Sequence, residues 1–313
     1  MELTPKNYHS PEADAEYMSS HQWREWITCP SRAKARLDGR YVEEPSEALL
    51  IGSYVDCMLL TPDDVPAFEA EHAAELFSRP TKDRLAAAGL VSGKATIDDV
   101  LQQHPEAAVL GEPRAGAQMA RSCADRVRRD PGMMAALEGE RQVIVKAQLG
   151  GVWWKCMVDV LRRAELRIVD LKTTASLARS DWTSGATIFH ALALRDGRDP
   201  GVRSLRAPWY EVYHYWGQAA IYRAAVLSVY GDLCDFMLAA VSKQKPPDVD
   251  MYLMADQSRL DTELQMIEAW LPQVVRWKSG EDDAPHCWQE VDEDCPWCRG
   301  EKVARLLEAR SVM

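Results

Sequence analysis

The chain has 313 residues, with 37 Lys and Arg against 48 Asp and Glu, a formal net charge of -11 and 47% hydrophobic residues. This composition is that of an ordinary globular protein, and the length suffices for one large domain. No run approaches the roughly 18 consecutive apolar residues of a membrane helix, and the acidic start lacks a basic region followed by an apolar one. These features argue against a membrane protein and a secreted precursor, and they favour a cytoplasmic protein. The acidic balance argues against a chain coated in nucleic acid, but it leaves room for a local basic groove.

The first half of the chain is predicted to be helical. Trp23 and Trp26 fall at helical spacing within Met18–Gly39, and the apolar run Ser46–Leu60 predicts a second helix. From 66 to 139, Ala-rich pieces alternate with Gly and Pro breaks. We interpret this interval as a helical insertion before the main sheet.

The second half has the pattern of a sheet flanked by helices. Alternating apolar and polar residues predict three consecutive strands, at 142–149, 152–161 and 166–171. A helix, two further strands and an amphipathic helix follow, at 209–230, 236–241, 249–254 and 258–278. This order predicts an α/β (α+β) fold in which helices cover a mixed central sheet.

We expect a single domain over residues 1–313. Its predicted parts are the N-terminal helices with the first Cys (1–65) and the helical insertion (66–139). A catalytic core (140–280) and a Cys-containing end (281–313) follow.

Two carboxylates and an ammonium group are expected to meet at one edge of this sheet. Asp159 lies near the end of one predicted strand, while Asp170 and Lys172 are two residues apart on the next and share a face. Phosphodiester hydrolysis needs such groups, because carboxylates hold Mg²⁺ ions that activate water while a Lys neutralises developing charge. The alternative is a structural ion pair between Asp170 and Lys172 at a strand end.

The segment from Asp159 to Lys172 resembles the PD-(D/E)XK nuclease superfamily. The segments around it resemble the RecB-like branch, particularly the RecE (exonuclease VIII-like) phage exonucleases. Residues 218–222 (QAAIY) are similar to the Q-x-x-x-Y motif of that branch, and residues 243–247 (KQKPP) to the strand-loop that follows it. Residues 50–56 (LIGSYVD) resemble its G-x-x-x-H helix. The resemblance covers residues 18–298 and implies a restriction-endonuclease-like fold.

The resemblance also implies a metal-dependent active site. In it Asp159, Asp170 and Lys172 are catalytic, and the two carboxylates bind Mg²⁺ or Mn²⁺. The main-chain oxygen of Leu171 completes the coordination shell. This chain has Asp56 where the family has a metal-binding His, and its carboxylate can still offer an oxygen to a hard cation. The alternative for Asp56 is a surface residue of a weakened site.

The same resemblance implies that Gln218 and Tyr222 contact DNA or support the site, whereas Tyr222 could instead be a core aromatic residue. DNA ends are the implied substrate, and a single-strand annealing recombinase is the implied partner. A homo-oligomer is compatible with the sequence.

Four cysteines suggest a second metal site. Cys29 precedes the nuclease core, and Cys287, Cys295 and Cys298 follow it. This arrangement resembles the iron-sulfur subgroup of RecB-like nucleases, including the AddB-type members, in which a [4Fe-4S] cluster joins the two ends of the domain. The order differs from the family pattern, because the close C-x-x-C pair comes last. Zn²⁺ held by the same thiolates or with His286, and no metal at all, remain alternatives.

The leading functional hypothesis is therefore a metal-dependent DNA exonuclease of phage or bacterial recombination or repair. A second hypothesis is a DNA-binding or assembly protein that keeps the nuclease fold with weakened catalysis, because the family His is missing. A third, a redox protein using Cys295 and Cys298, lacks a thioredoxin-like context.

Overall fold

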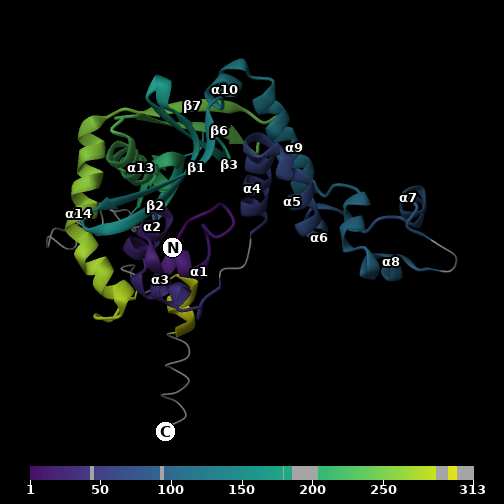
Figure 1. Ribbon diagram of the computed structural model, residues 1–313, viewed down its shortest axis with the longest axis horizontal. Coiled ribbons are helices and arrows are strands. Elements are labelled where there is room, and N and C mark those ends of the chain that lie inside the picture. The colour runs from purple at the N-terminus through teal and green to yellow at the C-terminus, as the bar shows by residue number, and fades with distance from the viewer. Residues whose placement is uncertain (43–45, 92–94, 179, 185–203, 287–294, 302–313) are drawn as a thin grey trace, which may run out of the picture.

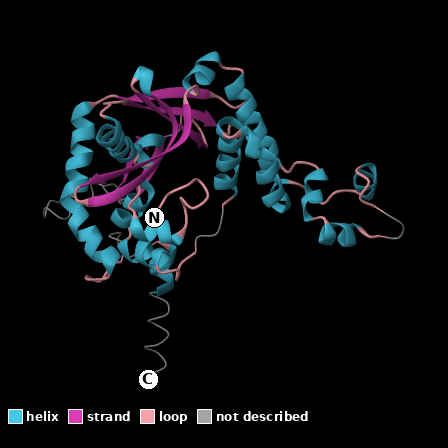
Figure 2. Ribbon diagram, viewed as in Figure 1, coloured by secondary structure: helices cyan, strands magenta, loops and turns pink. Residues whose placement is uncertain are grey.

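A five-stranded mixed sheet forms the centre of the protein (Figures 1 and 2). The structure, a computed structural model, describes residues 1–42, 46–91, 95–178, 180–184, 204–286 and 295–301. The strand order is β1-β2-β3-β6-β7; β3 and β6 are parallel, and the other neighbouring pairs are antiparallel. The predicted mixed sheet flanked by helices is confirmed. The bounds are β1 (Glu140–Leu149), β2 (Val152–Arg162), β3 (Arg167–Thr174), β6 (Asp235–Ser242) and β7 (Val249–Met254).

Helices cover both faces of this sheet. On one face lie α13 (Tyr215–Tyr230), which connects the parallel strands β3 and β6, and α14 (Gln257–Ser279). On the other face lie α4 (Glu47–Leu60) and α9 (Ala115–Arg128). The apolar side chains of the strands divide between two buried clusters, one on each side. No helix of the described part of the chain has the length and hydrophobicity needed to cross a bilayer.

The expectation of one helix over Met18–Gly39 is wrong, because the chain forms two helices there. These are α2 (Ser20–Thr28) and α3 (Pro30–Leu37). Cys29 between them has an extended backbone with φ of -152°. Pro30 has no N–H to donate to the preceding turn, so it starts a helix and cannot continue one. The break places the Cys29 side chain at the junction of two helices.

A short helix, α1 (Pro11–Glu16), precedes this pair and is joined to the sheet by an ion pair with a buried lysine. Lys155 of β2 is only 1% exposed, and its Nζ lies 2.7 Å from Asp14 Oδ1. The Lys155 ammonium also donates to the main-chain oxygen of Tyr8. These contacts hold the N-terminal segment against the sheet.

The interval 66–139, predicted as one insertion, divides into two parts. Its last helices, α9 and α10 (Pro131–Ala136), pack against the sheet and α4 within the main core. The described residues between 79 and 110 extend away from the sheet (Figure 1) and form a small apolar cluster of their own around Leu85 and Val100. The helices of the interval are α5 (Val65–Glu71), α6 (Ala73–Leu76), α7 (Lys82–Ala87), α8 (Ile97–Gln103) and α10 (Pro131–Ala136).

The helix expected over 209–230 is also broken in two. The short α12 (Trp209–Val212) is followed by Tyr213 and by His214, whose φ of 57° is left-handed, and α13 then begins at residue 215. A non-glycine residue in this conformation ends a helix and turns the chain. Before α12, β4 (Ser180–Ser184) and β5 (Ser204–Pro208) form a separate two-stranded sheet that was not predicted.

Candidate active site

Asp170 and Lys172 share one face of strand β3, as their two-residue spacing predicts, and this face lies toward α13. Asp170 is 2% exposed, and its Oδ2 lies 2.6 Å from Lys172 Nζ. Its other oxygen, Oδ1, accepts a hydrogen bond of 2.8 Å from Nε2 of Gln218 on α13. A buried carboxylate is thus held between an ammonium group and an amide donor, which sets its orientation.

Strand β2 loses its regular alternation at Asp159. Val158 packs on the α13 side of the sheet and Val160 on the α4 side, although residues two apart normally share a face. The β1 residue opposite Asp159 is Gln142, which has a left-handed φ of 52° and is skipped in the pairing of β1 with β2. Nε2 of Gln142 lies 3.4 Å from Asp159 Oδ1. An unfavourable backbone conformation is therefore maintained beside the candidate catalytic carboxylate.

The Asp159 side chain takes the place of a strand-to-strand hydrogen bond. The described pairs of β2 with β3 end at Val160 and Val169. Beyond this point Asp159 Oδ2 accepts a hydrogen bond of 2.8 Å from the main-chain N–H of Leu171. The main-chain oxygen of Leu171 accepts from Lys172 Nζ at 3.3 Å. The two strands separate here, and the separation opens room for polar groups between them.

Helix α4 brings a third carboxylate, Asp56, into the field of the other two. Burial and then the charge of Asp159 raise the pKa of Asp56 well above its ordinary value. Burial and then Asp170 raise the pKa of Asp159 to about 7. Burial works against the charge of Lys172, but the attraction of Asp170 and Asp159 outweighs it and raises the pKa of Lys172. The site therefore favours added positive charge.

The donor set of these three carboxylates fits a hard divalent cation. Asp56 Oδ1 is buried and has no hydrogen-bond partner among the described residues, and the contact of Asp170 Oδ2 with Lys172 lacks hydrogen-bond geometry. Among the described residues, the only group of three potential ligand atoms within 4.8 Å of one another is a cluster of cysteines. The oxygens of Asp56, Asp159 and Asp170 are therefore more widely spaced than this. Mg²⁺ usually keeps several waters and needs only one or two carboxylates, so this spacing is compatible with it.

Gln218 and Tyr222 lie on the face of α13 toward this site. Gln218 supports Asp170 through the hydrogen bond already described. Tyr222 is 6% exposed, and its ring meets the Phe236 ring edge-on at 6.0 Å between centroids. Both residues also line a pocket beside Lys172. Tyr222 thus packs in the core and also borders the site, so the two interpretations of this residue are compatible.

Three of the four predicted thiol ligands come together. Cys29 Sγ lies 3.4 Å from Cys298 Sγ and 3.7 Å from Cys295 Sγ. Cys287 lies outside the described residues. Burial, together with the neighbouring sulfur atoms, raises the pKa of Cys29. Nδ1 of His286 lies 3.3 Å from Cys298 Sγ, so an imidazole also borders the cluster.

The thiol cluster joins residues from the two ends of the described chain. The Ser31 N–H, at the start of α3, donates to the main-chain oxygen of Pro285 at 2.9 Å. Nε1 of Trp297 donates to the Ser31 hydroxyl at 3.0 Å. Figure 1 shows the short yellow C-terminal helix beside α3. The geometry fits soft thiolate ligation of a metal.

The raised pKa of Asp159 predicts a pH dependence of stability without metal. The pKa moves from the ordinary 3.8 to about 7 on folding, so the folded state favours the protonated form. This contribution to stability is complete below about pH 4 and is lost as pH rises to about 7. In EDTA, Asp159→Asn should therefore gain about 1–3 kcal/mol over wild type at pH 8 and almost nothing at pH 4. Urea unfolding measures both values, and equal effects at the two pH values would contradict the prediction.

The fold and this site define the class of protein. The mixed sheet is restriction-endonuclease-like, with Asp159 on one strand and Asp170 and Lys172 two residues apart on the next. This arrangement is characteristic of the PD-(D/E)XK nuclease superfamily. The model of a family described as "PDDEXK-like domain of unknown function" (DUF3799) matches residues 19–190 and 201–301. The chain belongs to this family, and the resemblance of the sequence to the PD-(D/E)XK nuclease superfamily is confirmed.

A solved structure gives an independent comparison. The crystal structure of a "putative exonuclease" from Eubacterium rectale is similar to this chain, with a TM-score of 0.72 and 27% sequence identity. The match covers 96% of this chain and 93% of that chain. No curated protein matches the sequence significantly.

Proposed function

We propose that the protein is a metal-dependent DNA exonuclease that hydrolyses phosphodiester bonds at DNA ends. The main support is the buried pair of Asp170 and Lys172 beside Asp159, at the point where β2 and β3 separate. An ion pair that only stabilised the fold would not require a second buried carboxylate with a raised pKa next to it. The similarity to the "putative exonuclease" from Eubacterium rectale supports hydrolysis that starts from chain ends.

Asp56, Asp159 and Asp170 would hold Mg²⁺ or Mn²⁺, with the main-chain oxygen of Leu171 as a further ligand. A divalent cation held by these residues would lower the pKa of a water nucleophile and stabilise negative charge on the phosphate. The remaining tasks fall to the side chains of the protein.

Lys172 acts as a permanent cation in this proposal. Asp170 and Asp159 raise its pKa, so its ammonium stays protonated at neutral pH and cannot serve as a general base. Its role is to orient the attacking water or to neutralise charge on the phosphate oxygens. Gln218 keeps the Asp170 carboxylate in place, because it donates to the oxygen that Lys172 does not contact.

A second candidate function is a nuclease-fold protein with weakened catalysis that binds DNA or assembles with other proteins. Asp56 is the observation in its favour, because a buried carboxyl with a strongly raised pKa is a poorer ligand than the family His.

The cysteine cluster would be a structural metal site under either candidate function. We propose that Cys29, Cys295, Cys298 and Cys287 hold a [4Fe-4S] cluster there, with Zn²⁺ as the alternative.

A time course on end-labelled linear DNA, with a closed circular control, tests the exonuclease. Protein purified without oxygen should degrade the linear DNA with Mg²⁺ or Mn²⁺, leave the circle intact and be inactive in EDTA. Cutting of the circle would show an endonuclease. Inert, folded and metal-loaded protein would support the second candidate. A role in recombination, with a single-strand annealing recombinase as partner, needs co-purification from a host, which would also show whether the chain forms a homo-oligomer.

A further inference from the structure

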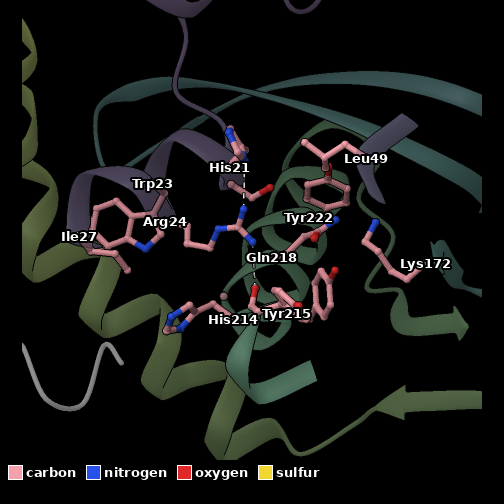
Figure 3. A pocket seen from close by; sticks show the side chains of 13 residues that line it. His21, Trp23, Arg24, Ile27, Leu49, Lys172, His214, Tyr215, Gln218 and Tyr222 are labelled. Carbon is pink, nitrogen blue, oxygen red and sulfur yellow. Dashed lines mark hydrogen bonds between the residues drawn. The ribbon is translucent and has the colours of Figure 1, made fainter. Parts of the chain in front are cut away.

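A pocket of about 340 Å³ opens beside Lys172 (Figure 3). Its walls come from α2, the first turn of α4, and the corner between α12 and α13. Pockets that bind small molecules range from roughly 300 to 1,000 Å³. The pocket therefore has room for a single nucleotide but not for a duplex.

None of the described residues that line this pocket is acidic, although the chain has 48 Asp and Glu. Two cationic side chains face it, Arg24 from α2 and Lys172 from β3. Figure 3 shows their side chains reaching toward the pocket from opposite sides, with Gln218 and Tyr222 of α13 between them. Two cations and no carboxylate among the described lining residues, in a chain with a net charge of -11, indicate an anionic ligand.

Arg24 has no carboxylate partner in the described part of the chain. Its guanidinium donates to the main-chain oxygen of Tyr213 at 3.4 Å and lies 3.3 Å from Nδ1 of His21. The neighbouring Arg36, in contrast, forms an ion pair with Glu25. Arg24 is half-buried on a helix whose Trp23 is packed in the core, so its position is well defined. Its unpaired planar fork matches the geometry of a phosphate.

Aromatic side chains complete the pocket. Tyr213, at the corner before α13, is 45% exposed, and the Tyr215 ring lies 5.5 Å from Lys172 Nζ. His214 between them turns the chain with its left-handed φ, so that both tyrosines border the pocket. Burial, together with Arg24 and Arg259, lowers the pKa of His214 to about 4, so this residue is neutral at pH 7. The exposed ring of Tyr213 and the half-buried ring of Tyr215, beside a cationic groove, suit the stacking of unpaired bases.

We propose that this pocket binds one unpaired nucleotide of the cleaved strand through a phosphate next to the scissile one. Arg24 is the phosphate-binding residue, and Tyr213 and Tyr215 form the stacking surface. The proposal rests on the proposed nuclease function, because Lys172 links the pocket to the reaction site. The phosphate is either the terminal phosphate of a DNA end or an internal phosphodiester.

Binding of short fluorescent single-stranded oligonucleotides, measured by anisotropy with Ca²⁺ in place of Mg²⁺, tests the proposal without cleavage. Arg24→Gln should bind at least about tenfold more weakly than wild type, because a charge-assisted hydrogen bond is lost. The slope of log K against log salt should fall by about 0.7. Arg79→Gln is the matched control, because this substitution removes the same charge at an exposed residue. Arg79 pairs with Asp98 in the part of the chain that extends away from the sheet. The control should bind within twofold of wild type.

The oligonucleotides carry a 5′-phosphate, a 3′-phosphate or hydroxyl ends. A preference of wild type for one phosphorylated end, lost in Arg24→Gln, assigns the terminal phosphate and indicates polarity. Equal binding of all three, with the Arg24 effect retained, assigns an internal phosphodiester. Arg24→Lys, which keeps the charge but not the fork, should fall between wild type and Arg24→Gln.

Unchanged affinity and salt slope in folded Arg24→Gln would overturn the proposal, even if the protein is a nuclease. Conversely, wild-type protein that binds through Arg24 but never cleaves DNA with Mg²⁺ or Mn²⁺ would contradict the proposed exonuclease function. The proposal that the pocket binds a nucleotide would still hold. A far-UV circular dichroism spectrum checks that each variant is folded. If Arg24→Gln is unfolded, Arg24→Lys decides the test, and affinity equal to wild type in that variant would contradict a role for the fork.

Discussion

Asp170→Asn should lower DNA cleavage by about 10³-fold or more while leaving the protein folded. The substitution keeps the shape of the side chain and an oxygen that can still accept from Gln218. It removes the charge that pairs with Lys172 and would bind the cation. Because Asp170 is buried, no neighbouring water-exposed carboxylate can take over its position. Single-turnover rates on linear DNA at saturating Mg²⁺ measure the effect.

The matched control is Asp235→Asn, which removes an exposed carboxylate at the far end of the neighbouring strand β6. It should leave the cleavage rate within about twofold, since surface substitutions of this kind have small effects. Cleavage by Asp170→Asn at the wild-type rate would show that the reaction takes place elsewhere on the protein.

The second large effect is expected from Cys29→Ser. Cys29 is buried, and its sulfur contacts those of Cys295 and Cys298, so its loss removes a ligand at the centre of the cluster. A metal that joins the N-terminal helices to the C-terminal segment stabilises the folded state by its binding free energy. We expect a loss of at least about 3 kcal/mol of stability and of most of the bound metal.

Elemental analysis of anaerobically purified protein identifies that metal. About four irons per chain, with visible absorbance, would indicate the [4Fe-4S] cluster, and one zinc the alternative. Cys234→Ser is the control, because Cys234 is equally buried but packs in the main core away from the cluster. Wild-type protein without metal, and equal stability of the two variants, would contradict a metal site.

The arrangement of the sheet could be predicted because its signals are local. Alternation along β1, β2 and β3 and the turn at Gly150 and Gly151 specify the strands. The face shared by Asp170 and Lys172 follows from the same alternation. The resemblance to the family motif implied that Gln218 contacts DNA or supports the site. In the structure Gln218 donates a hydrogen bond to Asp170, which is far from it in the chain.

Other features depend on tertiary contacts and left no signal in the sequence. The left-handed backbone of Gln142 and the change of face at Asp159 arise from the pairing of β1 with β2 around a buried carboxylate. Likewise, Arg24 looks like one of many surface cations in the sequence, and only the fold shows that no carboxylate of the described residues pairs with it. The break at Cys29 was readable in principle, because Pro30 follows it and helices commonly begin with proline.

The proposed active site is tested most directly by soaking crystals of the protein in Mn²⁺ and calculating the anomalous difference map from data collected at the manganese edge. The proposed site predicts a peak between Asp159 and Asp170, within coordinating reach of Asp56, at about 2.0–2.3 Å from the carboxylate oxygens. The peak should disappear in Asp170→Asn. A wild-type map without a peak there, in crystals whose protein still cleaves DNA with Mn²⁺, would contradict the assignment of this active site.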